Sequence, residues 1–232
     1  MDFSGKRVLI TGGSRGIGKA CVQAFAARGA KVAVNYQSDQ QAAQETLDGL
    51  PGDEHILIQA DVAQPDSVET MVAEAVKAFG KLDIVVNNAG IGQHHPIDAV
   101  NYAAWQDAWR RILSVNLLGP ANVMYWAAQH MISSGGGRIV NVSSRGAFRG
   151  EPEQPAYGAS KAGLNSMSQS LAQKLAKHNI TVGVVAPGFV ETDMAASRLS
   201  GSGGDGIRAQ SPFGRVARPE EVAYAVLFLA SE

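Results

Sequence analysis

The chain has 232 residues, of which 45% are hydrophobic and 18% are charged, and its formal net charge is −1. This length suits one large domain with a sizeable core. The share of charged residues is below average, which leaves neutral surface for contacts between subunits. The interspersed charges form no basic tract, so nucleic acid and anionic membrane surfaces are not expected partners.

The single cysteine, Cys21, excludes a disulfide within the chain and fits a reducing compartment. It lies in an apolar helical run, where an inert core thiol is the expected role. The N-terminus has no basic and apolar leader, and no apolar run approaches the ~18 residues of a membrane span. We therefore expect a cytoplasmic protein without a transmembrane segment.

Short apolar runs alternate with helical patterns through the first half of the chain. Gly80 is expected to end a helix, and Ser38 or Asp39 to cap the start of another. The alternation predicts a parallel sheet with helices on both faces. The predicted strands are 7–10, 32–34, 56–58 and 84–86, and the predicted helices are 19–28, 40–50 and 68–79.

The second half continues the α/β pattern after a loop. One long helix is predicted at 102–131, strands at 138–142 and 182–185, a helix that carries Tyr157 and Lys161 and continues through Leu175, and a last helix at 219–229. The polar, glycine-rich stretch 197–210 predicts a mobile loop, and the segment 195–210 that contains it is expected to form a lid. The sequence thus predicts a single α/β domain over 1–232, with a dinucleotide-binding half of about 1–90 and a catalytic and substrate half of about 91–232.

A glycine cluster follows the first predicted strand and opens a helix. Its spacing is G-x-x-x-G-x-G at Gly12, Gly16 and Gly18. In this context backbone N–H groups and a helix N-terminus can hold the phosphates of a dinucleotide. The same stretch also reads G-x-x-x-x-G-K, the phosphate loop of nucleotide triphosphatases, but Ala20 stands where that loop needs Ser or Thr.

The end of the second strand, Asn35-Tyr36, lacks the carboxylate that NAD-dependent enzymes place there. Asp39 is close in sequence, but capping of the next helix explains it. Arg15, inside the glycine turn, can pair with the 2′-phosphate of NADP(H). NADP(H) is therefore predicted as the preferred cofactor, with NAD(H) as the alternative.

Tyr157 and Lys161 lie four residues apart and so share one face of a helix. A nearby ammonium favours the charged phenolate, so such a pair can form a proton donor and acceptor that works near neutral pH; a surface helix with a chance Tyr/Lys spacing is the alternative. Ser144 ends a strand, where it can polarise a carbonyl or merely cap a turn. Asn116 interrupts an apolar helix, where it either kinks the helix or holds a water near Lys161.

Two further strand ends are candidates for cofactor contacts. Asp61, followed by Val62, can accept a hydrogen bond from an adenine amine or cap the turn before Pro65. The small residues of 88–90 let the backbone approach a cofactor closely, although an ordinary turn is the alternative.

Adjacent histidines, His94 and His95, suggest a metal, but no Cys, Asp or Glu lies at a matching spacing, so a pocket lining is the better prediction. Other charged residues are expected at the pocket entrance or beside an anionic substrate, with solvent exposure as the alternative: Arg145, Arg149, Glu151, Glu153, Arg198 and Arg208.

These motifs occur together in one order: Thr11–Gly18, Asn87–Gly90, Asn116, Ser144, Tyr157-x-x-x-Lys161 and Pro187-Gly188. In that combination the chain resembles the short-chain dehydrogenase/reductase family, and most of all its 3-oxoacyl-[acyl-carrier-protein] reductase-like branch. The resemblance implies a Rossmann fold and hydride transfer between a nicotinamide and a carbonyl or secondary alcohol.

The resemblance also implies the site residues. Tyr157 would be the general acid/base, Lys161 would lower its pKa, Ser144 would bind the substrate oxygen and Asn116 would anchor a water relay. No metal is expected. The implied cofactor contacts are Gly12, Ser14, Arg15, Gly16, Ile17, Gly18, Asn35, Tyr36, Asp61, Val62, Asn88, Ala89, Gly90, Tyr157, Lys161, Pro187, Gly188, Val190 and Thr192.

Two other functions are compatible with the sequence: an NAD-dependent sugar or alcohol dehydrogenase, and a cofactor-sensing protein of the same fold without catalysis. The expected partners are a small-molecule substrate and further copies of the chain, as a homotetramer or a dimer. The last strand that the family usually carries beyond the final helix is missing.

Overall fold

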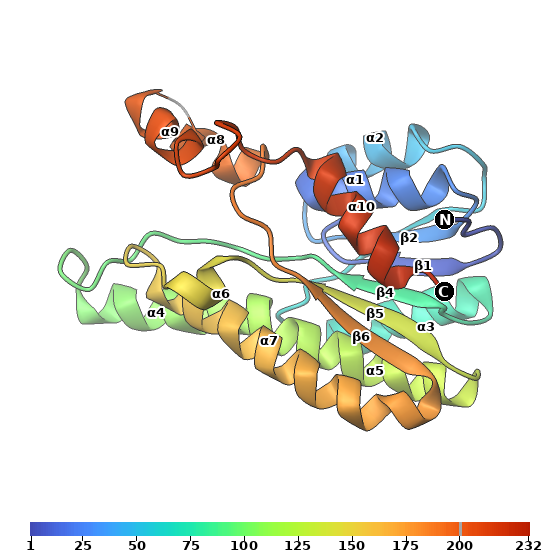
Figure 1. Cartoon of the computed structure of the whole chain (residues 1–232). Helices are drawn as coiled ribbons and strands as arrows, with labels where there is room; N and C mark the ends of the chain where they lie inside the picture. Colours follow the sequence, from blue (N-terminus) through green and yellow to red (C-terminus); the bar gives the residue numbers. More distant parts are fainter. Residues whose placement is uncertain (200) are drawn as a thin grey trace.

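One six-stranded parallel sheet organises the protein, a computed structural model that describes residues 1–199 and 201–232 (Figure 1). The strand order is β3-β2-β1-β4-β5-β6, in which the chain starts at the centre, builds one half and then crosses back to build the other. This is the order of dinucleotide-binding folds. The strands are β1 (Arg7–Ile10), β2 (Lys31–Tyr36), β3 (Ile56–Gln59), β4 (Ile84–Asn87), β5 (Gly137–Val142) and β6 (Ile180–Val185).

Helices cover both faces of the sheet (Figure 1). One face carries α1 (Gly16–Ala26), α2 (Gln40–Asp48) and α10 (Pro219–Ala230). The other carries α3 (Pro65–Phe79), α4 (Tyr102–Leu113), α5 (Gly119–Ser133) and α7 (Pro155–Leu175). The shorter segments are a π-helix (Ser114–Leu118), α6 (Gly146–Arg149), a 3₁₀ turn (Ala176–His178), α8 (Asp193–Leu199) and α9 (Gly201–Arg208).

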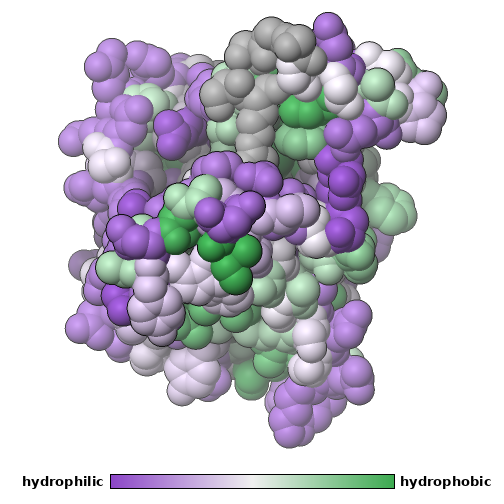
Figure 2. Space-filling model, turned by 90° about the vertical axis from the view of Figure 1, so that its left-hand side faces the viewer, coloured by the Kyte–Doolittle hydropathy of each residue, from purple (hydrophilic) through white to green (hydrophobic). Residues whose placement is uncertain are grey.

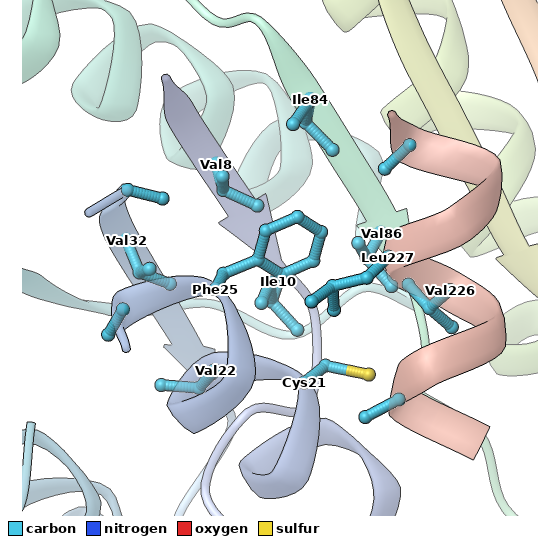
Figure 3. Close-up of a cluster of buried hydrophobic side chains, with 14 of the residues drawn as sticks. Val8, Ile10, Cys21, Val22, Phe25, Val32, Ile84, Val86, Val226 and Leu227 are labelled. Atoms are coloured by element: carbon cyan, nitrogen blue, oxygen red, sulfur yellow. The ribbon is translucent and has the colours of Figure 1, made fainter. Parts of the chain in front are cut away.

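The apolar runs of the strands bury side chains on both faces, as expected for a parallel sheet covered by helices. Figure 3 shows the cluster between the sheet and α1 and α10, where Phe25 lies among Ile10, Val86 and Leu227. Burying one such side chain contributes roughly 1.5–3 kcal/mol. A second cluster forms on the opposite face, where Leu9 and Val85 meet α3, α5 and α7. These two cores hold the sheet between its helix layers. The candidate site lies at the edge of the sheet where the strands end.

The structure confirms the predicted strands and most helix boundaries. Asp39 caps α2, because its carboxylate accepts a hydrogen bond of 3.0 Å from the backbone N–H of Ala42. Gly80 ends α3 with φ +80°, a left-handed conformation that suits glycine. Helix α3 starts at Pro65, earlier than predicted, with proline in the first turn.

The predicted loop 197–210 is wrong, since α8 and α9 occupy most of this stretch. Low helix propensity of glycine was the basis for the prediction. Contacts that propensity does not describe stabilise the segment: Arg208 pairs with Asp205, and its Nη2 donates to the Leu199 carbonyl at 3.1 Å. Ser200 and the side chains of Ser197 and Arg198 lie outside the described parts, so the lid and the Arg198 contact stay predictions.

The long helix predicted at 102–131 is divided by the π-helical segment Ser114–Leu118, which joins α4 to α5. The segment contains Asn116 and is followed by Gly119. A Cβ at Gly119 would lie 2.9 Å from the carbonyl oxygen of Val62. The helix therefore approaches this backbone so closely that only glycine fits. The kink that the sequence suggested at Asn116 is therefore a local widening of the helix.

Within the described residues, no helix is both long and apolar enough to cross a bilayer. Strand β6 forms one edge of the sheet, and no strand follows α10 in this part of the chain.

Candidate active site

A cavity of about 340 Å³ opens where β5 and β6 end, beside the start of α1. Figure 2 views this edge of the molecule, where hydrophilic side chains surround smaller hydrophobic patches. Predicted site residues that line the cavity are Ile17, Ser144, Tyr157, Pro187, Gly188, Val190 and Thr192, and predicted entrance residues that line it are His94, Arg145 and Glu151. Ser143, from the same strand end as Ser144, and Ala195, from the predicted lid, also line it, whereas sequence reasoning missed Gly92, Gln154, Phe189 and Met194.

The glycine turn packs too closely for side chains. A Cβ on Gly18 would lie 2.1 Å from the carbonyl oxygen of Gly12, and Gly16 has φ +54°. Arg15 precedes α1 in an extended conformation, and its side chain does not cap the first N–H groups of the helix. A Cβ on Gly16 would touch Thr192 at 3.2 Å, which places the segment after β6 against the turn.

The turn is fastened to the end of β4. The Asn88 amide donates to the carbonyls of Thr11 and Gly12, both at 3.0 Å. In return, the Thr11 hydroxyl accepts hydrogen bonds of 3.0 Å from the backbone N–H groups of Asn88 and Ala89. These contacts give Asn88 and Ala89 a structural role in shaping the phosphate turn.

Asn35 is 2% exposed, and its side-chain amide forms hydrogen bonds with backbone groups. Its Nδ2 donates to three carbonyls at the ends of β2 and β3, while its Oδ1 accepts from the N–H of Gly12 at 3.2 Å. The Asn35 side chain therefore supports the glycine turn, and a direct contact of Asn35 with a cofactor stays a prediction. Tyr36 is also buried, and neither residue lines the cavity.

Arg15 is exposed, and within the described part of the chain its guanidinium forms no ion pair. Asp39 is engaged in capping α2, so the end of β2 offers no free carboxylate nearby. Asp61 uses one carboxylate oxygen to accept from the N–H of Ala63 at 2.9 Å, which bears out the turn-capping alternative. Both Asp61 and Val62 lie outside the cavity lining.

Tyr157 and Ser144 approach the cavity from different elements. Tyr157 lies in the first turn of α7, and Ser144 follows β5. The Ser144 Oγ accepts a hydrogen bond of 3.1 Å from the backbone N–H of Gly146. Because this bond uses a lone pair, the hydroxyl proton of Ser144 is left to donate to a substrate oxygen.

Lys161 lies one turn further along α7 and is 4% exposed. Its Nζ donates to the Val142 carbonyl at 2.9 Å and lies 5.9 Å from the centre of the Tyr157 ring. Burial lowers the lysine pKa to about 8, because removal from water disfavours the charged form. The amine is thus mostly an ammonium at neutral pH.

Asn116 is fully buried behind Lys161. Its amide forms a pair of 2.9 Å hydrogen bonds with the backbone N–H and carbonyl of Ile91, and its Nδ2 donates to the Ser160 hydroxyl at 3.2 Å. A Cβ on Gly90 would lie 3.4 Å from the Asn116 Oδ1 and 3.5 Å from the Lys161 Nζ. Gly90 thereby leaves the space in which these two groups approach.

The two histidines have separate roles. His94 lines the cavity, and its Nε2 lies 2.8 Å from a carboxylate oxygen of Glu153. His95 is 1% exposed and does not line it, so that part of the prediction is wrong. Its Nε2 accepts from the N–H of Ala156 at 3.2 Å and its Nδ1 contacts the Gln93 carbonyl at 2.8 Å. These hydrogen bonds place the proton on Nδ1 and tie the loop to the start of α7.

A buried polar network below the site joins β4, β5 and α7. The Asn87 amide donates to Asn141 at 2.8 Å, and the Asn141 amide donates to the Ser168 hydroxyl at 2.8 Å. Asn87 and Asn141 are polar residues in otherwise apolar strands, and that pattern is a signal by which the network could have been predicted. The network fixes α7 against the two strands that end at the cavity.

Residues 6–203 match the family model of short chain dehydrogenases. The chain belongs to the short-chain dehydrogenase family. Its members are oxidoreductases, and the match covers the glycine turn, the Tyr157–Lys161 helix and the segment after β6. Within the described residues, no group of His, Cys, Asp or Glu is arranged to hold a metal ion.

Curated relatives in this family match the whole chain. The 3-oxoacyl-[acyl-carrier-protein] reductase FabG of Thermotoga maritima is 39% identical over 236 residues, which cover 100% of this chain and 93% of that protein. The FabG of Escherichia coli is 40% identical over 232 residues, covering 100% and 92%.

Solved structures of short-chain dehydrogenases share the fold. A short chain dehydrogenase from Burkholderia cenocepacia, in complex with NADP, superposes with a TM-score of 0.91 at 37% identity, covering 100% of this chain and 93% of that one. A dehydrogenase/reductase from Sinorhizobium meliloti gives 0.88 at 32% identity, covering 99% and 89%.

Proposed function

We propose that this short-chain dehydrogenase interconverts a carbonyl and a secondary alcohol with NADP(H), using Tyr157 as the general acid/base. One observation carries the proposal: Tyr157 and Ser144 line the same cavity as the segment Pro187–Thr192, with the Lys161 ammonium buried behind them. When bound, the nicotinamide supplies or accepts the hydride. The protein's own groups orient the substrate and move the proton.

The roles of the side chains follow from their contacts. Ser144 donates its hydroxyl proton to the substrate oxygen, because the Gly146 N–H already occupies one of its lone pairs. Tyr157 transfers a proton to or from the same oxygen. The Lys161 ammonium, 5.9 Å from the tyrosine ring, stabilises the phenolate that forms. Asn116 fixes the Ile91 backbone beside Lys161 and anchors the proposed water relay.

The residues at the start of α1 fit a dinucleotide. The turn of Gly12, Gly16 and Gly18 is too closely packed or too strained for side chains, and the N–H groups at the helix N-terminus, which Arg15 does not cap, suit a pyrophosphate. Ile17 and Thr192 border the cavity where the nicotinamide would lie. The other proposed contacts are Ser14, Tyr36, Asp61, Val62, Asn88, Ala89 and Gly90.

Two observations favour NADP(H) over NAD(H). The exposed Arg15 has no carboxylate partner among the described residues, and the Asp39 carboxylate is engaged in capping α2. A 2′-phosphate would supply the missing partner for Arg15. The Burkholderia cenocepacia relative, solved with NADP, supports the same choice.

Exchange of the cofactor tests this choice. The kcat/KM with NADPH should exceed that with NADH by at least about tenfold, and Arg15→Gln should reduce the value for NADPH without reducing that for NADH, because one charged hydrogen bond is worth ~1.5–3 kcal/mol. Lys174→Gln, at the exposed far end of α7, is the control. A difference below tenfold would favour the NAD-dependent alternative.

A substrate panel of ketones, 3-oxoacyl thioesters and sugars, assayed with NADPH, tests the reaction itself. Oxidation of NADPH by at least one carbonyl class supports catalysis. Tight binding of the cofactor without turnover across the panel would instead favour the cofactor-sensing alternative.

Assembly and location stay predictions. Exposed apolar side chains on the helix that leads into and through α5, Leu118 and Tyr125, support a contact between copies of the chain, with a homotetramer as the proposed state. Light scattering at micromolar concentration tests it, and a monomer would contradict it. The cytoplasmic location rests on the single buried cysteine.

A further inference from the structure

Two arginines converge on one neutral oxygen at the mouth of the cavity. Arg145 directly follows Ser144 and lines the cavity, and Arg149 ends the short helix α6. The Arg145 Nη2 and the Arg149 Nη1 donate to the same Gln210 Oε1, at 2.9 and 3.2 Å. Two guanidinium groups therefore share a single amide oxygen where a carboxylate or phosphate would normally lie.

The charge of this pair is only partly offset by the carboxylate of Glu151 nearby. Among the described ion pairs, neither guanidinium is joined to a carboxylate. Glu151 lines the same cavity without pairing with them, and Glu153 is engaged with His94. Burial, followed by the nearby Arg149 charge, lowers the pKa of Arg145, and the Glu151 charge acts in the opposite direction without cancelling the shift. The site therefore holds two close positive charges that an anion would stabilise.

Arg145 is held in place by its surroundings. Its backbone N–H donates to the Pro187 carbonyl at 2.9 Å, and its guanidinium lies 4.6 Å from the centre of the Phe189 ring. A cation over an aromatic ring loses little further freedom when it binds a ligand. Arg145 is thus fixed between the proton-transfer residues and the cavity segment after β6.

We propose that Arg145 and Arg149 form a subsite for an anionic group, a carboxylate or a phosphate, carried by the carbonyl substrate. This inference rests on the proposed function and adds a substrate class to it. The Gln210 amide oxygen holds the two guanidiniums when no substrate is bound, and the substrate anion replaces it. Planar guanidiniums suit such an anion, because each offers paired N–H donors.

Equilibrium binding without turnover tests the subsite. Succinate and inorganic phosphate are titrated calorimetrically into the protein saturated with NADP⁺, with succinamide as the neutral counterpart of succinate. We expect saturable binding of at least one anion, no binding of succinamide, and an affinity loss of at least about tenfold in Arg145→Met and Arg149→Met. Arg149→Lys should keep part of the affinity, and Lys174→Met should keep all of it.

Three results would overturn the subsite. They are no saturable binding of either anion, equal affinity in the two methionine variants, and binding only of a polyanion such as polyglutamate, which would indicate a docking surface for an acidic protein. Succinate binding alone identifies a carboxylate subsite, and phosphate binding alone a phosphate subsite. Tyr157→Phe separates the two proposals, because it should abolish turnover while keeping anion affinity. Turnover that survives in Tyr157→Phe counts against the reaction mechanism and leaves the subsite standing.

Discussion

The ammonium of Lys161 is buried with the Val142 carbonyl as its hydrogen-bond acceptor, at 2.9 Å. A buried charge normally has an opposite charge beside it. Here the helix holds an uncompensated cation behind Tyr157, which suits a proton donor that must become an anion during each turnover. Burying this charge costs free energy of folding, and the first prediction follows from that cost.

Replacement of Lys161 by Met should change how stability depends on pH. The folded-state pKa of Lys161, about 8, is below the ordinary lysine pKa of 10.5, so the unfolded state binds more protons between these values. Below pH 8 burying the charge costs about 3 kcal/mol, and this cost disappears as the pH rises to 10.5. The wild-type protein should therefore gain about 3 kcal/mol relative to Lys161→Met across this window.

Urea denaturation of both proteins at several pH values measures that difference. Lys174→Met removes an exposed lysine from the same helix and is the matched control. A difference between wild type and Lys161→Met that stays constant between pH 8 and 10.5 would contradict the buried charge.

His95→Ala should destabilise the protein and reduce kcat together. The substitution leaves the buried N–H of Ala156 without its acceptor and removes the ring that packs edge-on against Trp105. An unsatisfied buried donor costs roughly 1–3 kcal/mol. Since Ala156 precedes Tyr157, the start of α7 loosens at the residue that transfers the proton.

Thermal unfolding and kcat are measured for His95→Ala and, as a comparison, for His94→Ala. The exposed ion pair of His94 with Glu153 should contribute no more than about 1 kcal/mol to stability. If the two alanine variants behave alike, His95 does not position α7.

Cys21 should be unreactive in the folded protein. The side chain is fully buried in the cluster of Figure 3, and burial raises the pKa of its thiol to about 12. The thiolate that reacts with disulfide reagents is therefore both rare and inaccessible. A colorimetric thiol assay should detect one thiol in guanidinium and none under native conditions. Reaction of the native protein at the rate of a free cysteine would contradict this prediction.

Local patterns were sufficient for the strands, the glycine turn and the spacing of Tyr157 and Lys161. Hydrophobic periodicity and short motifs predict these features because each pattern lies within a few residues of the chain. It does not predict contacts between distant segments: Asn116 meets Ile91, and His95 meets Ala156, across loops that no pattern describes. The glycine-rich helix α9 was missed for the same reason, since Arg208 stabilises it through the Leu199 carbonyl.

The convergence of Arg145 and Arg149 on Gln210 also lay beyond the sequence. Both arginines were expected near the entrance, but the partner comes from a stretch that was predicted to be a loop. Asn35 was expected to contact the cofactor. In the structure its side chain supports the glycine turn by accepting a hydrogen bond from the N–H of Gly12, a contact across 23 residues that the sequence pattern does not describe.

The kcat of Tyr157→Phe, measured on the protein's own carbonyl substrate with saturating NADPH, tests the proton-transfer role most directly. Tyr102→Phe, an exposed tyrosine on α4, is the control and should match wild type. Loss of the phenolic proton donor should lower kcat by about 10²-fold or more, with the fold and cofactor affinity unchanged. A Tyr157→Phe enzyme that keeps about a tenth or more of the wild-type kcat would contradict the mechanism.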